Sequence, residues 1–185
     1  MQKGKIIFLN GVSSSGKTTL AKTLQEKLPE PYCWISVDNF LNTIHEKFFI
    51  SEYRTTLRQT LKAMHHTIKL FSDMGLNVIV DHVLEKQEWL DECVKILHEN
   101  PVLFVHVTCQ LEELQRREKE RGDRNIGQGE SQILMLKNAN PKDIYDITID
   151  THYNVKEECA NKIIDMLNYP EKFTAFKSLW SQRKL

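Results

Sequence analysis

The chain has 185 residues, of which 41% are apolar, and its 25 basic side chains balance its 25 acidic ones. This length and composition predict one domain over residues 1–185, and the charge balance argues against a nucleic-acid or anionic-membrane partner. The chain contains no apolar run long enough for a signal peptide or a membrane span. We therefore expect a cytoplasmic protein. The sequence leaves open whether the protein forms a homo-oligomer.

The first predicted elements are a strand over residues 4–10 and a helix over 16–28, with a glycine-bounded loop between them. The loop fits the pattern G-x-x-x-x-G-K-[ST] and runs into Thr19; its residues are Gly11, Val12, Ser13, Ser14, Ser15, Gly16, Lys17 and Thr18. In such a loop the backbone N–H groups surround a phosphate, the lysine lies between the β- and γ-phosphates, and the hydroxyl binds Mg²⁺. We expect residues 11–19 to bind ATP, with Thr18 as a metal ligand. The alternative is a Ser/Gly turn that caps an ordinary helix.

Apolar runs and amphipathic helices alternate along the rest of the chain. The further strands are predicted over residues 32–37, 77–81, 102–107 and 144–150. The further helices are predicted within 39–50 and over 52–74, 86–99, 110–121, 130–138, 155–168 and a C-terminal tail, 170–185. This alternation predicts an α/β fold of the phosphate-loop kinase type, a three-layer sandwich in which helices cover both faces of a parallel sheet of about five strands.

Aspartates follow several of the predicted strands. Because the carboxyl ends of parallel strands meet at one edge of a sheet, Asp38, Asp81 and Asp150 should lie beside the phosphate loop. Asp81 could hold Mg²⁺, directly or through water, or could cap the next helix. Asp38 is placed to orient the hydroxyl of a phosphate acceptor and to take its proton, although it could instead cap a helix.

The segment after Asp38 should build the acceptor pocket. It is rich in apolar residues, including Phe40, which belong either to the core or to a pocket wall. Arg54, at the start of the long helix, faces either the acceptor or the solvent. We expect the acceptor to contact Asp38, Phe40, Arg54 and Asp81.

Residues 117–130 are predicted to form a mobile lid, because the segment is polar and contains several glycines. Arginine grips phosphate oxygens with two parallel hydrogen bonds and keeps its charge. We expect Arg117 to bind the nucleotide, and Arg121 and Arg124 to act in catalysis with Lys17 by neutralising charge on the transferred phosphoryl group. The alternative is a solvated, charged helix.

These residues together resemble the chloramphenicol phosphotransferase family of small-molecule kinases, over nearly the whole chain to about residue 168. Beyond the phosphate loop, the resemblance rests on Leu28-Pro29-Glu30-Pro31, Val78-Ile79-Val80-Asp81, Arg121-Gly122-Asp123-Arg124, and Gly127 with Gln132. It implies ATP-dependent phosphorylation of a hydroxyl, with Asp38 as the base, Lys17 on phosphate, and Arg121 and Arg124 in the lid. The stretch between Asp38 and Arg54 is shorter here than in the antibiotic kinase.

The sequence therefore predicts a kinase that uses ATP and Mg²⁺ to phosphorylate a hydroxyl of a small molecule. A nucleotide, adenylylsulfate or nucleotide-sugar kinase is an alternative. So is a non-catalytic ATP-binding regulatory protein, for which the apolar tail from Phe173 to Trp180 would be a partner surface.

Overall fold

A five-stranded parallel sheet forms the centre of the structure. The structure is a computed structural model that describes residues 2–48, 52–121, 127–139 and 144–183, without the side chains of Arg121 and Lys137. The strands are β1 (Ile6–Asn10), β2 (Tyr32–Ser36), β3 (Asn77–His82), β4 (Val102–Thr108) and β5 (Ile147–Asp150), in the spatial order β2-β3-β1-β4-β5. The predicted parallel sheet is confirmed.

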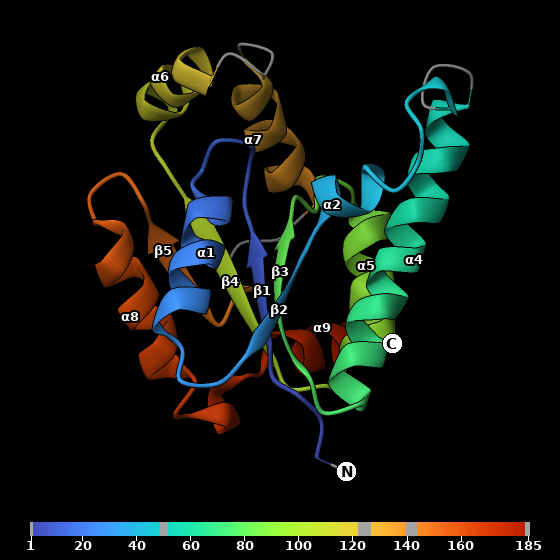
Figure 1. Ribbon diagram of the computed structural model, residues 1–185, viewed down its shortest axis with the longest axis vertical. Helices are drawn as coiled ribbons and strands as arrows, with labels where there is room; N and C mark the ends of the chain where they lie inside the picture. The colour runs from blue at the N-terminus through green and yellow to red at the C-terminus, as the bar shows by residue number, and fades with distance from the viewer. Residues whose placement is uncertain (1, 49–51, 122–126, 140–143, 184–185) are drawn as a thin grey trace.

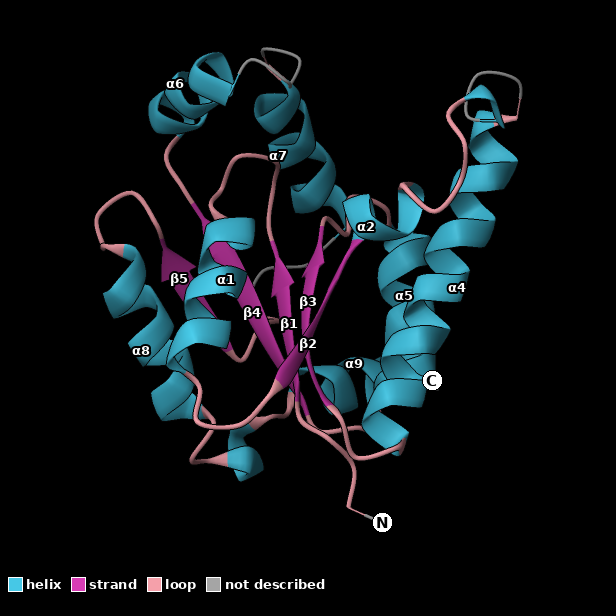
Figure 2. Cartoon of the chain, viewed as in Figure 1, coloured by secondary structure: helices cyan, strands magenta, loops and turns pink. Residues whose placement is uncertain are grey.

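Helices cover both faces of the sheet, as predicted (Figure 1). They are α1 (Lys17–Lys27), α2 (Val37–Leu41), α4 (Tyr53–Asp73), α5 (Gln87–Leu97), α6 (Leu111–Arg121), α7 (Gln128–Ala139), α8 (Lys156–Met166) and α9 (Ala175–Arg183), with a short 3₁₀ turn η1 (Pro170–Lys172). Helices α1 and α8 pack together on one face, and α4, α5 and α9 cover the other. Figure 2 shows α6 and α7 beyond the carboxyl ends of the strands, above the edge where ligands of such sheets bind.

The central strands are buried on both faces, which explains their continuous apolar sequence. In β1, Ile6 and Phe8 face α4, α5 and α9, whereas Ile7 and Leu9 face α1 and α8. This arrangement holds the end of β1 rigidly, and with it the start of the phosphate loop.

Three strands are shorter than predicted. β1 begins at Ile6, two positions later than predicted. β2 ends at Ser36, so Asp38 lies in α2 and does not end a strand. β5 begins at Ile147, because the carboxylate of Asp146 accepts hydrogen bonds from the backbone N–H groups of Phe104, Thr174 and Ala175 (2.8, 2.8 and 2.9 Å). Those bonds tie the start of the tail to β4.

The C-terminal tail is part of the core. Phe176 in α9 is 2% exposed and packs against Phe8 and Phe104, with ring centroids 5.7 and 5.0 Å away. Phe173 is buried against the cluster on the other face. The apolar residues of the tail thus have partners within the chain, which removes the reason for reading them as a surface for another protein.

Part of the predicted lid lies outside the described residues, at positions 122–126. Helix α7 begins at Gln128, two positions earlier than the sequence suggested. None of the helices that the structure describes is long and apolar enough to cross a membrane.

Candidate active site

A cleft of about 980 Å³ opens at the carboxyl ends of the strands. One side is formed by the phosphate loop, α1, Arg117 and the start of α8; the other is formed by α2, α4 and the segment that follows β3. The lining residues on which the argument depends are Ser13, Lys17, Thr18, Asp38, Asp81, His82, Glu85, Trp89, Arg117 and Gln132.

The two glycines of the phosphate loop are required for different reasons. Gly16 has a φ of 93°, a left-handed conformation that side chains disfavour. Gly11 has no such φ, but a Cβ there would lie 2.2 Å from the carbonyl oxygen of Val107, so only glycine fits against β4.

Lys17, Thr18 and Asp81 meet at the floor of the cleft. The hydroxyl of Thr18 donates to Oδ2 of Asp81 at 2.7 Å, and Nζ of Lys17 lies 3.9 Å from Oδ1 of the same carboxylate. Nζ of Lys17 also donates to the carbonyl of Val12 at 2.8 Å. Lys17 is 5% exposed and Asp81 8%, so this charged pair is largely withdrawn from water. The alternative role of Asp81 as a helix cap does not apply, because Asp81 lies within β3.

The loop offers donors suited to phosphate. Gly16 is the N-cap of α1 and carries no side chain that could cap the first-turn amides, which leaves the positive end of the helix open to an anion. The buried hydroxyls of Ser14 and Ser15 have no hydrogen-bond partner among the described residues. The oxygen ligands of Thr18 and Asp81 suit a hard cation such as Mg²⁺. These residues fit a nucleotide–magnesium complex.

Arg117 reaches the phosphate loop from α6. Its guanidinium donates to the carbonyl of Ser14 (3.3 Å) and to Oγ1 and the carbonyl of Thr151 (3.1 and 2.9 Å). On its other side it pairs with Glu113, whose pKa falls to about 2 because Arg116 and Arg117 both donate to its carboxylate. Arg117 is thus held on the phosphate-loop side of the cleft, and its contact with a nucleotide stays a prediction. Among the described residues, Arg116 pairs with side chains of its own helix.

Asp38 lies in the first turn of α2 and lines the cleft opposite the phosphate loop. It does not cap that helix: the hydroxyl of Ser36 accepts the hydrogen bond from the Asn39 N–H at 3.1 Å. Asp38 is exposed and lines the cleft, which favours the acceptor-side role over the capping role.

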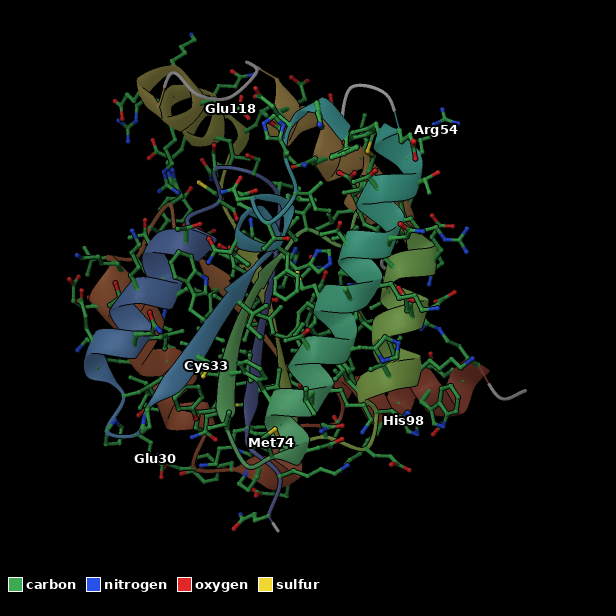
Figure 3. The ribbon with its side chains drawn as sticks, turned by 45° about the vertical axis from the view of Figure 1, so that its right-hand side comes forward. Glu30, Cys33, Arg54, Met74, His98 and Glu118 are labelled. Carbon is green, nitrogen blue, oxygen red and sulfur yellow. The ribbon has the colours of Figure 1, made fainter. Side chains whose placement is uncertain are left out.

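Phe40 and Arg54 are not brought to the cleft. Phe40 packs against the core cluster on the α4–α5 face, and its neighbours Val37 and Leu41 line the cleft instead. Arg54 is exposed near the start of α4 and points away from the body of the molecule (Figure 3). The side chains of Arg121 and Arg124 lie outside the described residues, and Asp150 accepts from the His152 N–H in its own turn (2.7 Å).

Two further residues organise the site and had no assigned role. Glu118, 1% exposed, accepts hydrogen bonds from the N–H groups of Gly127 (2.9 Å) and Gly129 (2.7 Å), so it joins α6 to α7. Gln132 in α7 accepts from the Ser13 N–H at 2.6 Å and donates to Glu85 at 3.2 Å. Gln132 had appeared only within the family pattern, and its partners lie 119 and 47 positions away in the chain, so spacing alone gave no signal.

His82 belongs to a buried chain of hydrogen bonds. Its Nε2 lies 3.0 Å from Nε2 of His65, and Nδ1 of His65 lies 3.0 Å from the carboxylate of Glu92. Burial lowers the pKa of both histidines, and the neighbouring His65 lowers the pKa of His82 further. His82 is therefore a packed, buried histidine that also lines the cleft.

Comparison with known proteins gives a family match and several relatives. Residues 4–168 match the family described as chloramphenicol phosphotransferase-like protein. A protein of Mycobacterium tuberculosis, provisionally named an O-phosphotransferase, is 28% identical over 96% of this chain and 89% of its own length. An adenylyl-sulfate kinase of Clostridium acetobutylicum is 28% identical over 90% of this chain and 84% of its own.

The fold is shared with a solved kinase. The APS kinase CysC of Mycobacterium tuberculosis, in complex with AMPPNP and APS, superposes with a TM-score of 0.68 at 19% identity, and the match covers 91% of this chain and 99% of that one. At this identity the likeness concerns the fold.

Proposed function

Since the chain belongs to the chloramphenicol phosphotransferase-like family and is a kinase, we propose that it transfers the γ-phosphate of ATP to a hydroxyl of a small organic molecule. The observation that carries the proposal is the position of Asp38, across one cleft from the phosphate loop. A protein that only sensed ATP would have no use for a carboxylate on the acceptor side.

In the proposed reaction, the acceptor oxygen forms a bond to the γ-phosphorus while the bond from that phosphorus to the β–γ bridging oxygen breaks. The electron pair of the broken bond leaves with ADP. Asp38 orients the hydroxyl and takes its proton late, because a loose transition state requires little nucleophilic push. Lys17 and the open end of α1 stabilise the negative charge that develops on the phosphate oxygens.

Mg²⁺ would neutralise charge on the β- and γ-phosphates when bound. Thr18 and Asp81 are the residues that would hold it, Asp81 either directly or through water. Their mutual hydrogen bond of 2.7 Å supports this assignment, since it places two oxygen ligands together beside Lys17. The catalytic roles of Arg121 and Arg124 stay predictions from the sequence.

The second candidate is a kinase that acts on an anionic acceptor, above all adenylylsulfate. Its support is the 28% identity to adenylyl-sulfate kinases over most of the chain. It differs from the first candidate in the acceptor alone, so both share the donor half of the reaction.

The proposal is tested by ADP release from the full-length protein with ATP, Mg²⁺ and a library of hydroxylated compounds. We expect release that depends on an acceptor and that falls by about 10²- to 10⁴-fold in Asp38→Asn, the range that a positioned proton acceptor contributes. ATP binding should be unchanged in that variant. Normal turnover of the acceptor by Asp38→Asn would remove Asp38 from the mechanism, and tight ATP binding without transfer to any compound would favour a regulatory protein.

A further inference from the structure

The two halves of the cleft differ in charge. Among the lining residues that the structure describes, the cationic side chains are Lys17, Arg117 and Lys156, and all three lie with the phosphate loop, α6 and α8. The same half also contains the carboxylates of Glu120 and Glu157, so it carries both signs of charge. The opposite half, built by α2, α4, α5 and the segment after β3, contributes the carboxylates of Asp38 and Glu85. An anionic acceptor needs cationic partners when it leaves water, and the described part of this half supplies none.

The rest of the acceptor half is apolar or aromatic. Its wall is made of Val37, Leu41, Tyr53, Leu57, Leu61, Val83 and Trp89. Such a surface buries an apolar body, and the face of a tryptophan or tyrosine ring also attracts a cation. Lys86 already lies over the ring of Trp89, 5.0 Å from its centroid, although Lys86 is not one of the lining residues.

Glu85 is held close to the point where donor and acceptor would meet. One of its carboxylate oxygens, Oε2, accepts from Nε2 of Gln132, whose own Oε1 accepts from the Ser13 N–H of the phosphate loop. Gln132 is 9% exposed, so a nearly buried amide fixes the carboxylate one side chain away from the loop. A neutral acceptor would have no need of a second carboxylate there, because Asp38 already supplies the proton acceptor.

We infer that the acceptor is an amphipathic hydroxylated amine, whose ammonium group pairs with Glu85 while its apolar body lies against the α4–α5 wall. This inference rests on the proposed function and narrows its acceptor. Glu85 is then the residue that determines specificity, and Gln132 is the positioning residue that holds it. In the part of the cleft that the structure describes, the same charges disfavour adenylylsulfate and other anionic acceptors.

The test compares acceptors that share one hydroxylated body and differ in the charge of the nitrogen substituent. Amino alcohols with phenyl or alkyl bodies, 2-amino-1-phenylethanol among them, are assayed beside their uncharged N-acetyl and anionic N-succinyl derivatives, with ADP release as the readout. We expect kcat/KM for the amines to exceed that for both derivatives by about 10- to 100-fold, the range of one charge-assisted hydrogen bond. Equal or better turnover of the acetylated or succinylated partners would overturn the inference.

Variants at Glu85 supply the second arm. Glu85→Gln should abolish the preference for the amine, measured as the ratio of kcat/KM for the amine to kcat/KM for its N-acetyl derivative, and Glu85→Lys should favour the N-succinyl derivatives. Glu88→Gln is the matched control, since Glu88 is exposed in the first turn of α5 and does not line the cleft. A preference for amines that survives in Glu85→Gln would exclude Glu85 as its cause.

The two proposals fail in distinguishable ways. Turnover of neutral or anionic compounds only, in the wider library, would overturn the amine acceptor and leave the kinase reaction intact. Absence of ADP release with every compound, in a protein that binds ATP, would overturn the phosphotransfer itself.

Discussion

At the scale of single residues, the site depends on side chains whose partners come from distant parts of the chain. Thr18 and Asp81 are 63 positions apart, yet their hydrogen bond forms because β1 and β3 are neighbours in the sheet and Leu9 pairs with Asp81. Neighbouring parallel strands thus bring the two side-chain oxygens to one point. The pairing of β1 with β3 explains why the alternation of strands and helices is enough to predict that Thr18 and Asp81 lie close together.

Thr18→Ala should raise the Mg²⁺ concentration needed for half-maximal activity by at least about tenfold, because it removes one ligand and leaves Asp81 without its hydroxyl partner. Thr18→Ser is the matched control, since it keeps the hydroxyl. A Mg²⁺ titration of ADP release measures both. An unchanged Mg²⁺ requirement in Thr18→Ala would exclude the hydroxyl as a metal ligand.

At the scale of elements, α6 and α7 are held together by a buried carboxylate. Glu118 binds the N–H groups of Gly127 and Gly129, and a Cβ at Gly129 would lie 3.0 Å from its Oε1. The contact also places α7 so that Gln132 reaches Ser13. The helix pair above the cleft is therefore positioned by a charged side chain as well as by apolar packing.

Glu118→Ala should lower the free energy of unfolding by about 1–3 kcal/mol, because two backbone donors lose a charged acceptor. Glu118→Gln should cost less, since its amide oxygen can still accept one of the bonds. Glu112→Ala, on the exposed side of the same helix, is the control. Urea denaturation measures the free energy of unfolding of all three variants. A Glu118→Ala variant as stable as the control would contradict the role of Glu118 in holding α6 and α7 together.

The elements were predictable where burial dictates sequence. Ile6–Leu9 and Val78–Val80 are continuous apolar runs because both faces of a parallel sheet are covered. Asp38 was assigned to a strand end because the sequence predicted the helix within 39–50, whereas the cap at Ser36 begins α2 at Val37, two positions earlier. Phe40 and Leu41 could not be told apart from sequence, because which of two adjacent apolar residues faces the core depends on how α2 packs. Glu118 and Gln132 accept hydrogen bonds from backbone N–H groups of other segments, and the spacing of residues in the sequence does not predict such contacts.

At the scale of the whole molecule, the α4–α5 layer is joined to the sheet by a titratable network. His65 in α4, His82 in β3 and Glu92 in α5 form one chain of hydrogen bonds, and the ring of His82 lies between Phe8 and Trp89. His65 and His82 are 0% and 1% exposed, whereas the Glu92 side chain is 30% exposed. Protonation of the histidine pair would place charge in the core, so their neutral forms belong to the folded state. Lys17 adds to the lowering of the pKa of His82, and Glu92 opposes it at His65.

The sign of the resulting pH dependence follows from these pKa shifts. Both histidines have a lower pKa folded than the ordinary value of about 6.5, so the unfolded chain binds more protons as the pH falls below that value. Stability should be fully present above about pH 6.5 and should decline below it, by up to about 1.4 kcal/mol per pH unit for each histidine that gains a proton on unfolding. The double variant His65→Gln/His82→Gln should lose the part of that slope due to these two residues, whereas His66→Gln, exposed on the same helix, should keep it. His106, whose pKa burial also lowers, keeps its own contribution in both variants. Denaturation curves between pH 7.5 and 5.5 distinguish the two. Within the described residues, no other pair of buried histidines is hydrogen-bonded, so the double variant removes this contribution completely. If the wild type and the double variant showed the same slope, the acid sensitivity would come from other groups.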